Sequence, residues 1–165
     1  MARPIHAPRT PSRPLIIPLF IPHLGCPHRC IFCDQHAITA AADRIPSSTQ
    51  IARDIRQFLS YGKKERPTTQ VSFFGGNFLG LDQSVMLALL TAVTPFVERR
   101  LVDGIRFSTR PDTVDRQRLN WLSGFPVCNV ELGVQSMNDR VLTEAGRGHR
   151  AIDTETAVRR LKQRG

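Results

Sequence analysis

The sequence predicts an α/β fold built on parallel strands, and two observations support this. Short apolar runs alternate along the chain with longer segments whose apolar residues recur at helical spacing. The unusual polar and sulfur-bearing residues follow the apolar runs, where the loops at the carboxyl ends of parallel strands gather. The 165 residues accommodate about four βα units and a fifth helix, which is part of a parallel (β/α) barrel.

The first predicted strand runs from Leu15 to Ile21, a short apolar run that contains β-branched isoleucines. A helix is predicted to begin at Ser47 or Ser48, after Pro46, and to end at Gly62. One face of this helix is apolar and consists of Ile51, Ile55, Phe58 and Leu59. The first unit is therefore a strand followed by a helix that can cover a sheet.

The second predicted strand, Gln70–Phe74, stops at a pair of glycines. Asp82 can cap the helix that follows, and Pro95 is expected to kink or end that helix. The apolar face of the helix consists of Val85, Leu89, Ala92, Val93 and Phe96. This segment therefore repeats the strand-then-helix order of the first unit.

The third and fourth predicted strands are Gly104–Thr109 and Val127–Leu132. The short helix between them carries Val114, Leu119 and Leu122. Asn138 or Asp139 can cap another short helix, which ends near Gly146. These segments complete the four βα units.

The two ends of the chain differ in character. Residues 1–14 form a basic, proline-rich arm that is expected to be flexible, and the arm lacks the apolar core of a secretory signal. At the other end, an amphipathic helix from Asp153 to Gln163 is expected to bury Val158 and Leu161. The arm thus precedes a single folded unit over residues 15–165.

Composition narrows the choice of partners and location. With 23 lysines and arginines against 14 acidic residues, the net charge of +9 leaves nucleic acid and phosphorylated ligands open as partners. The longest apolar stretch, Leu15 to Leu24, is broken by prolines and is too short to cross a bilayer. We therefore expect no contact with a membrane and a cytoplasmic, reducing location.

Three of the four cysteines, Cys26, Cys30 and Cys33, follow the first strand with the spacing C-x3-C-x2-C. Three thiolates so close together on one loop favour a zinc ion or an iron–sulfur cluster. His28 or His36 could complete a Cys3His zinc site. Alternatively, the three cysteines hold a cubane cluster and leave one iron free for catalysis.

Several segments together resemble the radical S-adenosylmethionine superfamily. The cysteine motif has Phe32 before its third cysteine, and Gly75-Gly76 follows the second strand. The segments Phe73–Phe78, Ser108–Asp112, Glu131–Ser136 and Arg147–His149 resemble the branch that contains the Elongator catalytic subunit and oxygen-independent coproporphyrinogen III oxidase. The likeness implies that residues 15–165 are the N-terminal part of a radical S-adenosylmethionine core domain, a partial barrel cut short of the length of a full one.

The resemblance also implies roles for individual residues. Cys26, Cys30 and Cys33 would bind a 4Fe–4S cluster, whose fourth iron would chelate S-adenosylmethionine. Further contacts with S-adenosylmethionine are implied for Phe32, Gly75, Gly76, Asn77, Ser108, Arg110, Glu131 and Gln135. Phe32 would pack beside the adenine, and Glu131 and Gln135 would contact the ribose or the amino group. The glycine pair would let backbone carbonyls approach the amino group.

For several of these residues the sequence leaves a second interpretation open. The glycine pair could form a plain turn between strand and helix. Asn77 stands where the family more often has a small hydroxyl residue or a glutamate. Arg110 could pair with the cofactor carboxylate or solvate a loop end, and the role of Ser108 is equally open. Glu131, on a strand that is expected to be buried, could instead form a salt bridge to Arg106 or Arg110.

Two residues outside this set are assigned on general grounds. Cys128, alone on the fourth strand, is expected to be an inert buried thiol. His149 could face the substrate, although a single histidine in a loop is more often on the surface.

The resemblance implies reductive cleavage of S-adenosylmethionine to a 5′-deoxyadenosyl radical, with an electron from a donor such as flavodoxin or ferredoxin. Substrates in this branch include the wobble uridine of tRNA and porphyrins. Basic residues near the end of the chain favour RNA. They are Arg140, Arg147, Arg150, Arg159, Arg160, Lys162 and Arg164. The alternatives are that these charges form a solvated helix face, and that the chain is a non-catalytic cluster-binding or zinc-binding module or an inactive fragment.

Overall fold

The computed structural model describes residues 14–21, 25–33, 45–61 and 67–164. The strands are β1 (Leu15–Phe20), β2 (Thr69–Phe74), β3 (Gly104–Thr109) and β4 (Val127–Leu132). The helices are α2 (Ser48–Ser60), α3 (Gln83–Glu98), α4 (Arg116–Trp121), α5 (Asp139–Glu144) and α6 (Ala151–Lys162), with short 3₁₀ turns η2 (Phe78–Gly80) and η3 (Pro111–Thr113). The basic arm and the Gly62 helix end lie outside the described residues, apart from Pro14.

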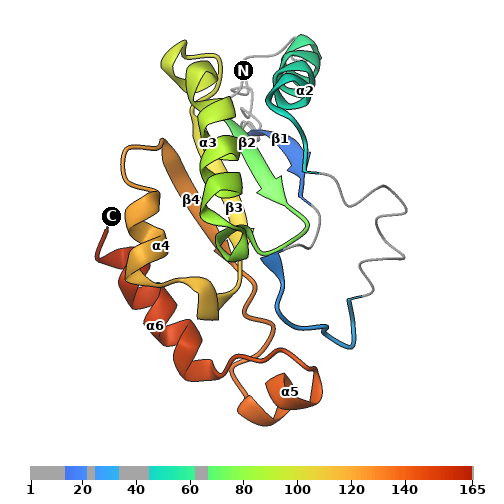
Figure 1. Ribbon diagram of the computed structural model, residues 1–165, viewed down its shortest axis with the longest axis vertical. Coiled ribbons are helices and arrows are strands. Elements are labelled where there is room, and N and C mark those ends of the chain that lie inside the picture. The colour runs from blue at the N-terminus through green and yellow to red at the C-terminus, as the bar shows by residue number, and fades with distance from the viewer. Residues whose placement is uncertain (1–13, 22–24, 34–44, 62–66, 165) are drawn as a thin grey trace, which may run out of the picture.

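In the described part of the chain, four parallel strands form one sheet in the order β1-β2-β3-β4 (Figure 1). Helix α2 contacts β1, helix α3 contacts β3, and the two helices contact each other, so both lie on the same side of the sheet. Each connection returns the chain to the same end of the sheet, as parallel strands require. The predicted α/β class and the four predicted strands are confirmed.

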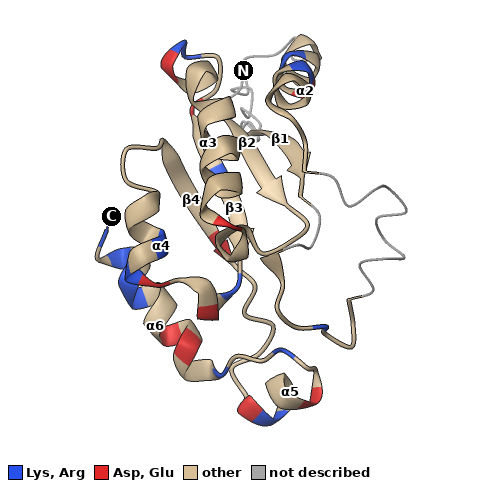
Figure 2. Cartoon of the chain, in the orientation of Figure 1, with Lys and Arg blue, Asp and Glu red and all other residues tan. Residues whose placement is uncertain are grey.

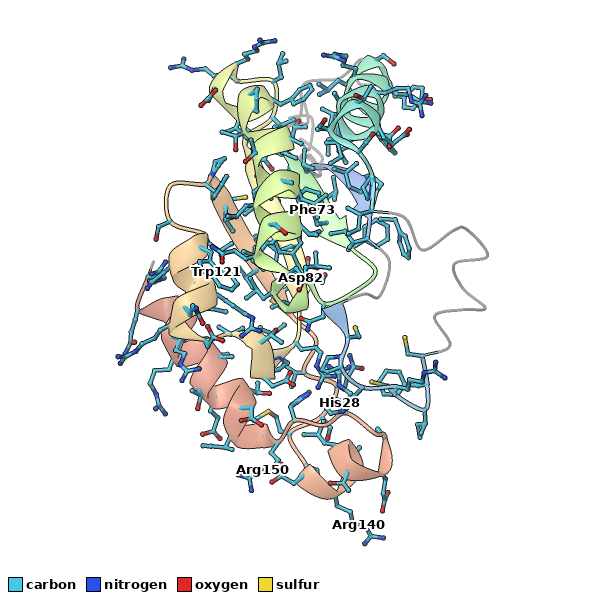
Figure 3. All side chains as sticks on the ribbon, viewed as in Figure 1. His28, Phe73, Asp82, Trp121, Arg140 and Arg150 are labelled. Carbon is cyan, nitrogen blue, oxygen red and sulfur yellow. The ribbon has the colours of Figure 1, made fainter. Side chains whose placement is uncertain are left out.

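The core lies between this sheet and its helices. Alternate residues of the strands point into it and are buried, namely Ile17, Leu19, Val71, Phe73, Ile105 and Phe107. The ring of Phe78 in η2 stacks on Phe73, with centroids 5.1 Å apart, and on Phe107 at 4.5 Å. Phe73 accordingly lies at the centre of the side-chain packing (Figure 3).

Two of the three predicted helix caps form, whereas Asp82 stands at the N-cap of α3 without a side-chain capping hydrogen bond. The hydroxyl of Ser47 accepts a hydrogen bond from the Gln50 amide at 3.2 Å and caps α2. The side chain of Asn138 accepts from the Arg140 amide at 2.9 Å and caps α5. Helix α6 begins at Ala151, two residues before the expected start, because the Asp153 carboxylate accepts from the Arg150 amide at 2.7 Å.

Pro95 does not end α3, which continues to Glu98, so of its two expected effects only a kink stays a prediction. One prediction about α6 is wrong. Val158 is exposed rather than buried. The face of α6 that meets the core carries Thr154 and Ala157, with Leu161 half-buried beside them.

Two predictions about β4 are also wrong, for one reason. Cys128 and Glu131 are both exposed rather than buried. In the described part of the chain β4 pairs only with β3, so its outer residues keep access to solvent. The Cys128 sulfur nevertheless lies 3.3 Å from the Ile105 carbonyl oxygen.

In the segments that the structure describes, no helix has both the length and the apolar character that a bilayer span requires.

Candidate cofactor site at the carboxyl ends of the strands

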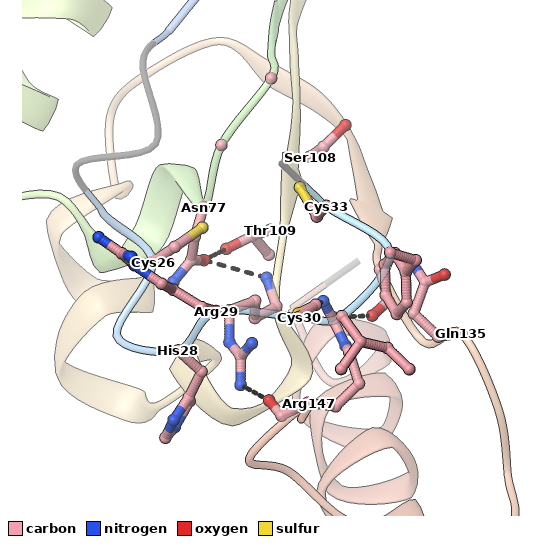
Figure 4. A pocket seen from close by; sticks show the side chains of 16 residues that line it. Cys26, His28, Arg29, Cys30, Cys33, Asn77, Ser108, Thr109, Gln135 and Arg147 are labelled. Atoms are coloured by element: carbon pink, nitrogen blue, oxygen red, sulfur yellow. Dashed lines mark hydrogen bonds between the residues drawn. The ribbon is translucent and has the colours of Figure 1, made fainter. Parts of the chain in front are cut away.

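A pocket of about 800 Å³ opens at the carboxyl ends of the strands (Figure 4). All three predicted metal ligands, Cys26, Cys30 and Cys33, line it. So do seven of the eight residues predicted to contact the cofactor, namely Phe32, Gly75, Gly76, Asn77, Ser108, Arg110 and Gln135. The structure therefore brings together residues from four separate loops, and Glu131 is the exception.

The cysteine loop fits an iron–sulfur cluster in the chemistry of its donors. Three thiols within eight residues line one pocket, and soft thiolates are the ligands that such clusters take. Among the described residues, no three Cys, His, Asp or Glu side chains are gathered in metal-binding geometry. His36, one of the two candidates for a zinc ligand, lies outside the described residues. The choice between zinc and a cluster therefore stays a prediction.

Asn77 fixes the cysteine loop to the strand ends. The side chain is buried, and its amide nitrogen donates to the Gly25 carbonyl at 2.7 Å. Its oxygen accepts from the Thr109 hydroxyl at 2.7 Å and from the Arg110 amide at 3.0 Å. Asparagine supplies the donor and the acceptor that this position needs. Its side chain thus has protein partners, and the contact with a cofactor stays a prediction.

Arg110 is buried, so the interpretation that it solvates a loop end is wrong. Its guanidinium donates to both carboxylate oxygens of Asp112, at 2.9 Å each, and to the backbone carbonyl of Arg147. A bidentate pair of this kind holds the arginine in one orientation. The loop after β3 is thereby tied to the loop before α6.

Arg147 is a site residue that the sequence alone did not assign. The side chain is buried, lines the pocket, and donates to the Cys30 sulfur at 3.3 Å and to the Gly133 carbonyl. Its Nε is buried with no hydrogen-bond partner among the described residues. The resemblance to the family included the Arg147-Gly148-His149 segment, which could have marked Arg147 as a site residue. The charge of Arg147 instead grouped it with the basic residues that favour RNA.

The charge of the pocket lining is positive. Arg29, Arg110 and Arg147 line it, whereas no aspartate or glutamate does so in the part of the chain that the structure describes. Guanidinium groups in a partly desolvated pocket favour carboxylate or phosphate ligands.

Residues 145–149 pack directly against the cysteine loop. The amide of Ile31 donates to the Ala145 carbonyl at 3.1 Å. A Cβ on Gly148 would lie 2.3 Å from the ring of His28, and Gly148 has a φ of +72°. With the His28 ring in this position, Gly148 has no room for a side chain, so a side chain there would displace the ring.

Replacing Gly148 by alanine is expected to destabilise the protein more than replacing Gly124, whose φ is +88° and whose Cβ would meet nothing within 4 Å. Both changes add strain of about 1–2 kcal/mol from a positive φ, but only Gly148→Ala also displaces the His28 ring. Urea unfolding measures the difference. In the double variant with His28→Ala the excess cost is expected to disappear. An equal loss of unfolding free energy in the two glycine variants would contradict the close contact between His28 and Gly148.

Glu131 lies beside the pocket rather than in its lining. Its carboxylate forms a salt bridge with Arg106 and accepts from the Ser108 hydroxyl at 2.9 Å. The alternative interpretation, a salt bridge to Arg106, is confirmed.

Gln135 lies in the pocket lining with a φ of +64°, a conformation that non-glycine residues adopt only when their surroundings impose it. Two short turns hold it there, because the Val134 amide donates to Leu132 and the Ser136 amide donates to Val134. Such strain is common in residues that contact a ligand.

The expectation that His149 lies on the surface is wrong. The side chain is 3% exposed, and both ring nitrogens are buried with no hydrogen-bond partner among the described residues. Burial lowers the pKa of His149, and the charge of Arg147 acts in the same direction.

This lowered pKa predicts acid sensitivity. The folded chain holds His149 neutral, whereas the unfolded chain takes up a proton near the ordinary pKa of 6.5. The free energy of unfolding is thus expected to be unaffected by His149 above pH 6.5 and to fall as the pH is lowered further. Urea midpoints at about pH 7.5 and about pH 5.5 test this. Between these two pH values the urea midpoint of His149→Asn should fall less than that of the unmodified chain. An equal fall in the two proteins would contradict the prediction.

The fold and the pocket define an α/β domain with a pocket at the carboxyl ends of its parallel strands, which is where domains of this class bind their ligands. The chain belongs to the radical S-adenosylmethionine superfamily, whose family model matches residues 20–165.

Three curated proteins are similar to the chain. An uncharacterised protein of Methanocaldococcus jannaschii is 27% identical over 86% of the chain and 46% of its own length. The heme chaperone HemW of Lactococcus lactis is 25% identical over 85% of the chain and 36% of its own length. The tRNA uridine(34) acetyltransferase of Dehalococcoides mccartyi is 25% identical over 86% of the chain and 37% of its own length. The chain thus spans less than half the length of these relatives.

Among solved structures, Elp3 of Methanocaldococcus infernus, with its N-terminal residues 1–46 deleted, has a similar fold. The TM-score is 0.54 at 20% identity, and the match covers 90% of the chain and 35% of that protein. This likeness supports the partial parallel (β/α) barrel of the radical S-adenosylmethionine type.

Proposed function

We propose that the chain binds a 4Fe–4S cluster through Cys26, Cys30 and Cys33, and S-adenosylmethionine in the adjoining pocket. The observation that carries this proposal is the convergence of the three cysteines, the glycine pair and the arginines on one pocket of about 800 Å³. The membership of the chain in the superfamily supports it. A cavity of this size is in the usual range for a cofactor of this class.

Different residues of the pocket can bind different groups of the cofactor. Arg147 offers its guanidinium group to a carboxylate, since no acidic side chain pairs with it among the described residues, whereas the Arg110 guanidinium already pairs with Asp112. Gly75, with a φ of +103°, turns the backbone at the end of β2 so that its carbonyls can approach an amino group. Phe32 lies half-exposed on the cysteine loop, where its ring can cover a bound adenine.

The chemistry that the cluster and S-adenosylmethionine supply when bound is one-electron reduction of the sulfonium, which breaks a carbon–sulfur bond to give methionine and a 5′-deoxyadenosyl radical. The chain itself orients the cofactor and keeps competing reactions away. Asn77 and Arg147 do the orienting, since they fix the cysteine loop to the ends of β3 and β4. The electron donor would be a flavodoxin or a ferredoxin.

Anaerobic reconstitution with iron and sulfide tests this proposal. We expect about four iron and four sulfide ions per chain, and no bound zinc when both metals are offered. Zinc in place of iron would support the non-catalytic zinc module and overturn the proposal.

For the substrate, we propose RNA. One relative is named as an acetyltransferase of tRNA uridine, whereas HemW, a heme chaperone, favours a porphyrin. The basic residues near the end of the chain support binding of RNA less strongly than their number suggests, because several of them already have partners within the chain. Arg140 pairs with Glu144 at 2.8 Å, Arg160 donates to the Val114 carbonyl at 2.7 Å, and Arg164 donates to residues of α4. Figure 2 nevertheless shows lysine and arginine gathered where the end of α6 lies beside α4.

Binding of tRNA is expected to weaken steeply with added salt, because each phosphate contact releases counterions. Filter binding at about 50 mM and about 200 mM salt measures the slope, with coproporphyrin as the comparison ligand. A porphyrin that binds tightly while tRNA does not bind at low salt would contradict the assignment to RNA.

A further inference from the structure

Asp112 lies in the turn η3 after β3 and is not among the residues that line the pocket. Its two carboxylate oxygens accept from Nε and Nη2 of the Arg110 guanidinium, at 2.9 Å each. The Arg110 side chain is 4% exposed, and no other acidic side chain of the described residues pairs with it. Because a buried cation is costly without a charged partner, the Asp112 carboxylate determines where this guanidinium lies.

The same guanidinium connects Asp112 to the cysteine loop through Arg147. Nη2 of Arg110 donates to the backbone carbonyl of Arg147 as well as to Asp112. The Arg147 side chain in turn donates from Nη1 to the Cys30 sulfur at 3.3 Å and from Nη2 to the Gly133 carbonyl. A chain of hydrogen bonds thus runs from Asp112 through two arginines to a predicted cluster ligand. We call this set, Asp112, Arg110, Arg147 and Cys30, the arginine relay.

The position of Arg147 depends on its backbone more than on its charge. Among the described residues Arg147 forms no salt bridge, so no carboxylate holds its buried guanidinium in place. Its backbone is held at both polar groups, because the amide donates to the Leu142 carbonyl at 3.0 Å and the carbonyl accepts from Arg110. Loss of the bond from Arg110 would therefore free one of the two points that aim Arg147 at Cys30.

We propose that Asp112 is a positioning residue of the cofactor site, which acts through Arg110 on Arg147 and thereby on Cys30. Partners that orient a metal ligand without touching the metal commonly change metal affinity or activity about 10–100-fold when they are replaced. Hydrogen bonds to the sulfur ligands of an iron–sulfur cluster also help to set its reduction potential. The competing explanation is that the charge of Asp112 acts on the site through space. This inference rests on the proposed function, because it concerns the cofactor of that pocket.

A double-mutant cycle of Asp112→Asn and Arg147→Met on the anaerobically reconstituted chain tests the arginine relay. A redox titration gives the midpoint potential of the cluster, and a spectral titration gives the affinity for S-adenosylmethionine. Asp112→Asn keeps the shape of the side chain but replaces one acceptor by a donor, so we expect it to shift the potential and to weaken binding about tenfold. In the Arg147→Met background the same substitution should leave the potential unchanged and alter the affinity less than about twofold, because Arg147 carries the effect.

Asp115→Asn is the matched control. Asp115 also pairs with an arginine, Arg118, but that arginine donates to the Leu79 carbonyl, outside the pocket lining. The control should lower the free energy of unfolding, because Asp115 caps α4, and should change neither the potential nor the affinity. If Asp112→Asn had no effect, or the same effect in both backgrounds, the arginine relay would be overturned.

Asp112→Glu answers the same question if Asp112→Asn does not fold. This substitution keeps the charge but moves the carboxylate by one methylene group. A positioning role predicts a shifted potential and weaker binding in the unmodified chain but not in Arg147→Met. An unchanged potential and affinity in the unmodified chain would show that only the charge matters, and would overturn the proposal.

The iron content of every sample separates failure of this proposal from failure of the proposed function. Normal iron in the unmodified chain, with additive effects of the two substitutions, would overturn only the arginine relay. Absence of iron from the unmodified chain would overturn the proposed function instead. In that case urea unfolding of the same four proteins still measures whether Asp112 and Arg147 are coupled, and additive changes in the free energy of unfolding would overturn the relay as well.

Discussion

The triple variant Cys26→Ala, Cys30→Ala, Cys33→Ala is expected to bind no iron or sulfide under conditions in which the unmodified chain does. The three cysteines line one pocket, and a cluster held by three thiolates has no other soft ligands on its loop. Turnover of S-adenosylmethionine is expected to vanish with the cluster. Iron and sulfide assays on the anaerobically reconstituted chain measure the first effect, and 5′-deoxyadenosine formation measures the second.

Cys128→Ala is the matched control for the triple variant. Cys128 is a cysteine of the same chain but lies on the exposed edge of β4, outside the pocket lining. The Cys128→Ala variant should therefore bind as much iron as the unmodified chain. Iron retained by the triple variant, or lost in Cys128→Ala, would refute the assignment of the ligands.

Arg147→Met is expected to weaken binding of S-adenosylmethionine at least tenfold and to lower the free energy of unfolding by about 1–3 kcal/mol. The substitution keeps much of the apolar stem but removes the donors to the Cys30 sulfur and the Gly133 carbonyl. It also removes a buried cation from a pocket that is suited to a carboxylate. Equilibrium binding of the cofactor to the reconstituted chain and urea unfolding measure the two effects.

Arg140→Met provides the comparison. Arg140 is on the exposed surface of α5, where its pair with Glu144 contributes less than about 0.5 kcal/mol. This variant should bind the cofactor normally. If Arg147→Met kept full cofactor affinity while losing stability, Arg147 would be a purely structural clamp of the cysteine loop.

Much of the fold could be predicted because its signals are local. The apolar runs of β1 to β4 and the caps Ser47 and Asn138 are each visible within a few residues of sequence. The position of the site was predictable for the same reason, since parallel strands deliver their following loops to one edge. Ten of the eleven predicted residues consequently line the pocket.

The errors share a different origin, because they depend on contacts between distant segments. The exposure of Cys128 follows from the place of β4 at the edge of the described sheet, which its own residues do not encode. The burial of His149 and the role of Arg147 depend on the packing of residues 145–149 against a loop more than a hundred residues earlier in the chain. Likewise, Asn77 departs from the usual family residue, and only the structure gives it partners in two segments, the cysteine loop and the end of β3.

The central claim is that one pocket holds both a cluster with an open iron and S-adenosylmethionine. The most direct measurement is the electron paramagnetic resonance spectrum of the reduced, reconstituted chain before and after addition of S-adenosylmethionine. A cofactor that binds the open iron should change the spectrum, whereas S-adenosylhomocysteine, which lacks the sulfonium, serves as a comparison for binding without cleavage. A 4Fe–4S spectrum that S-adenosylmethionine leaves unchanged at saturating concentration would contradict the claim.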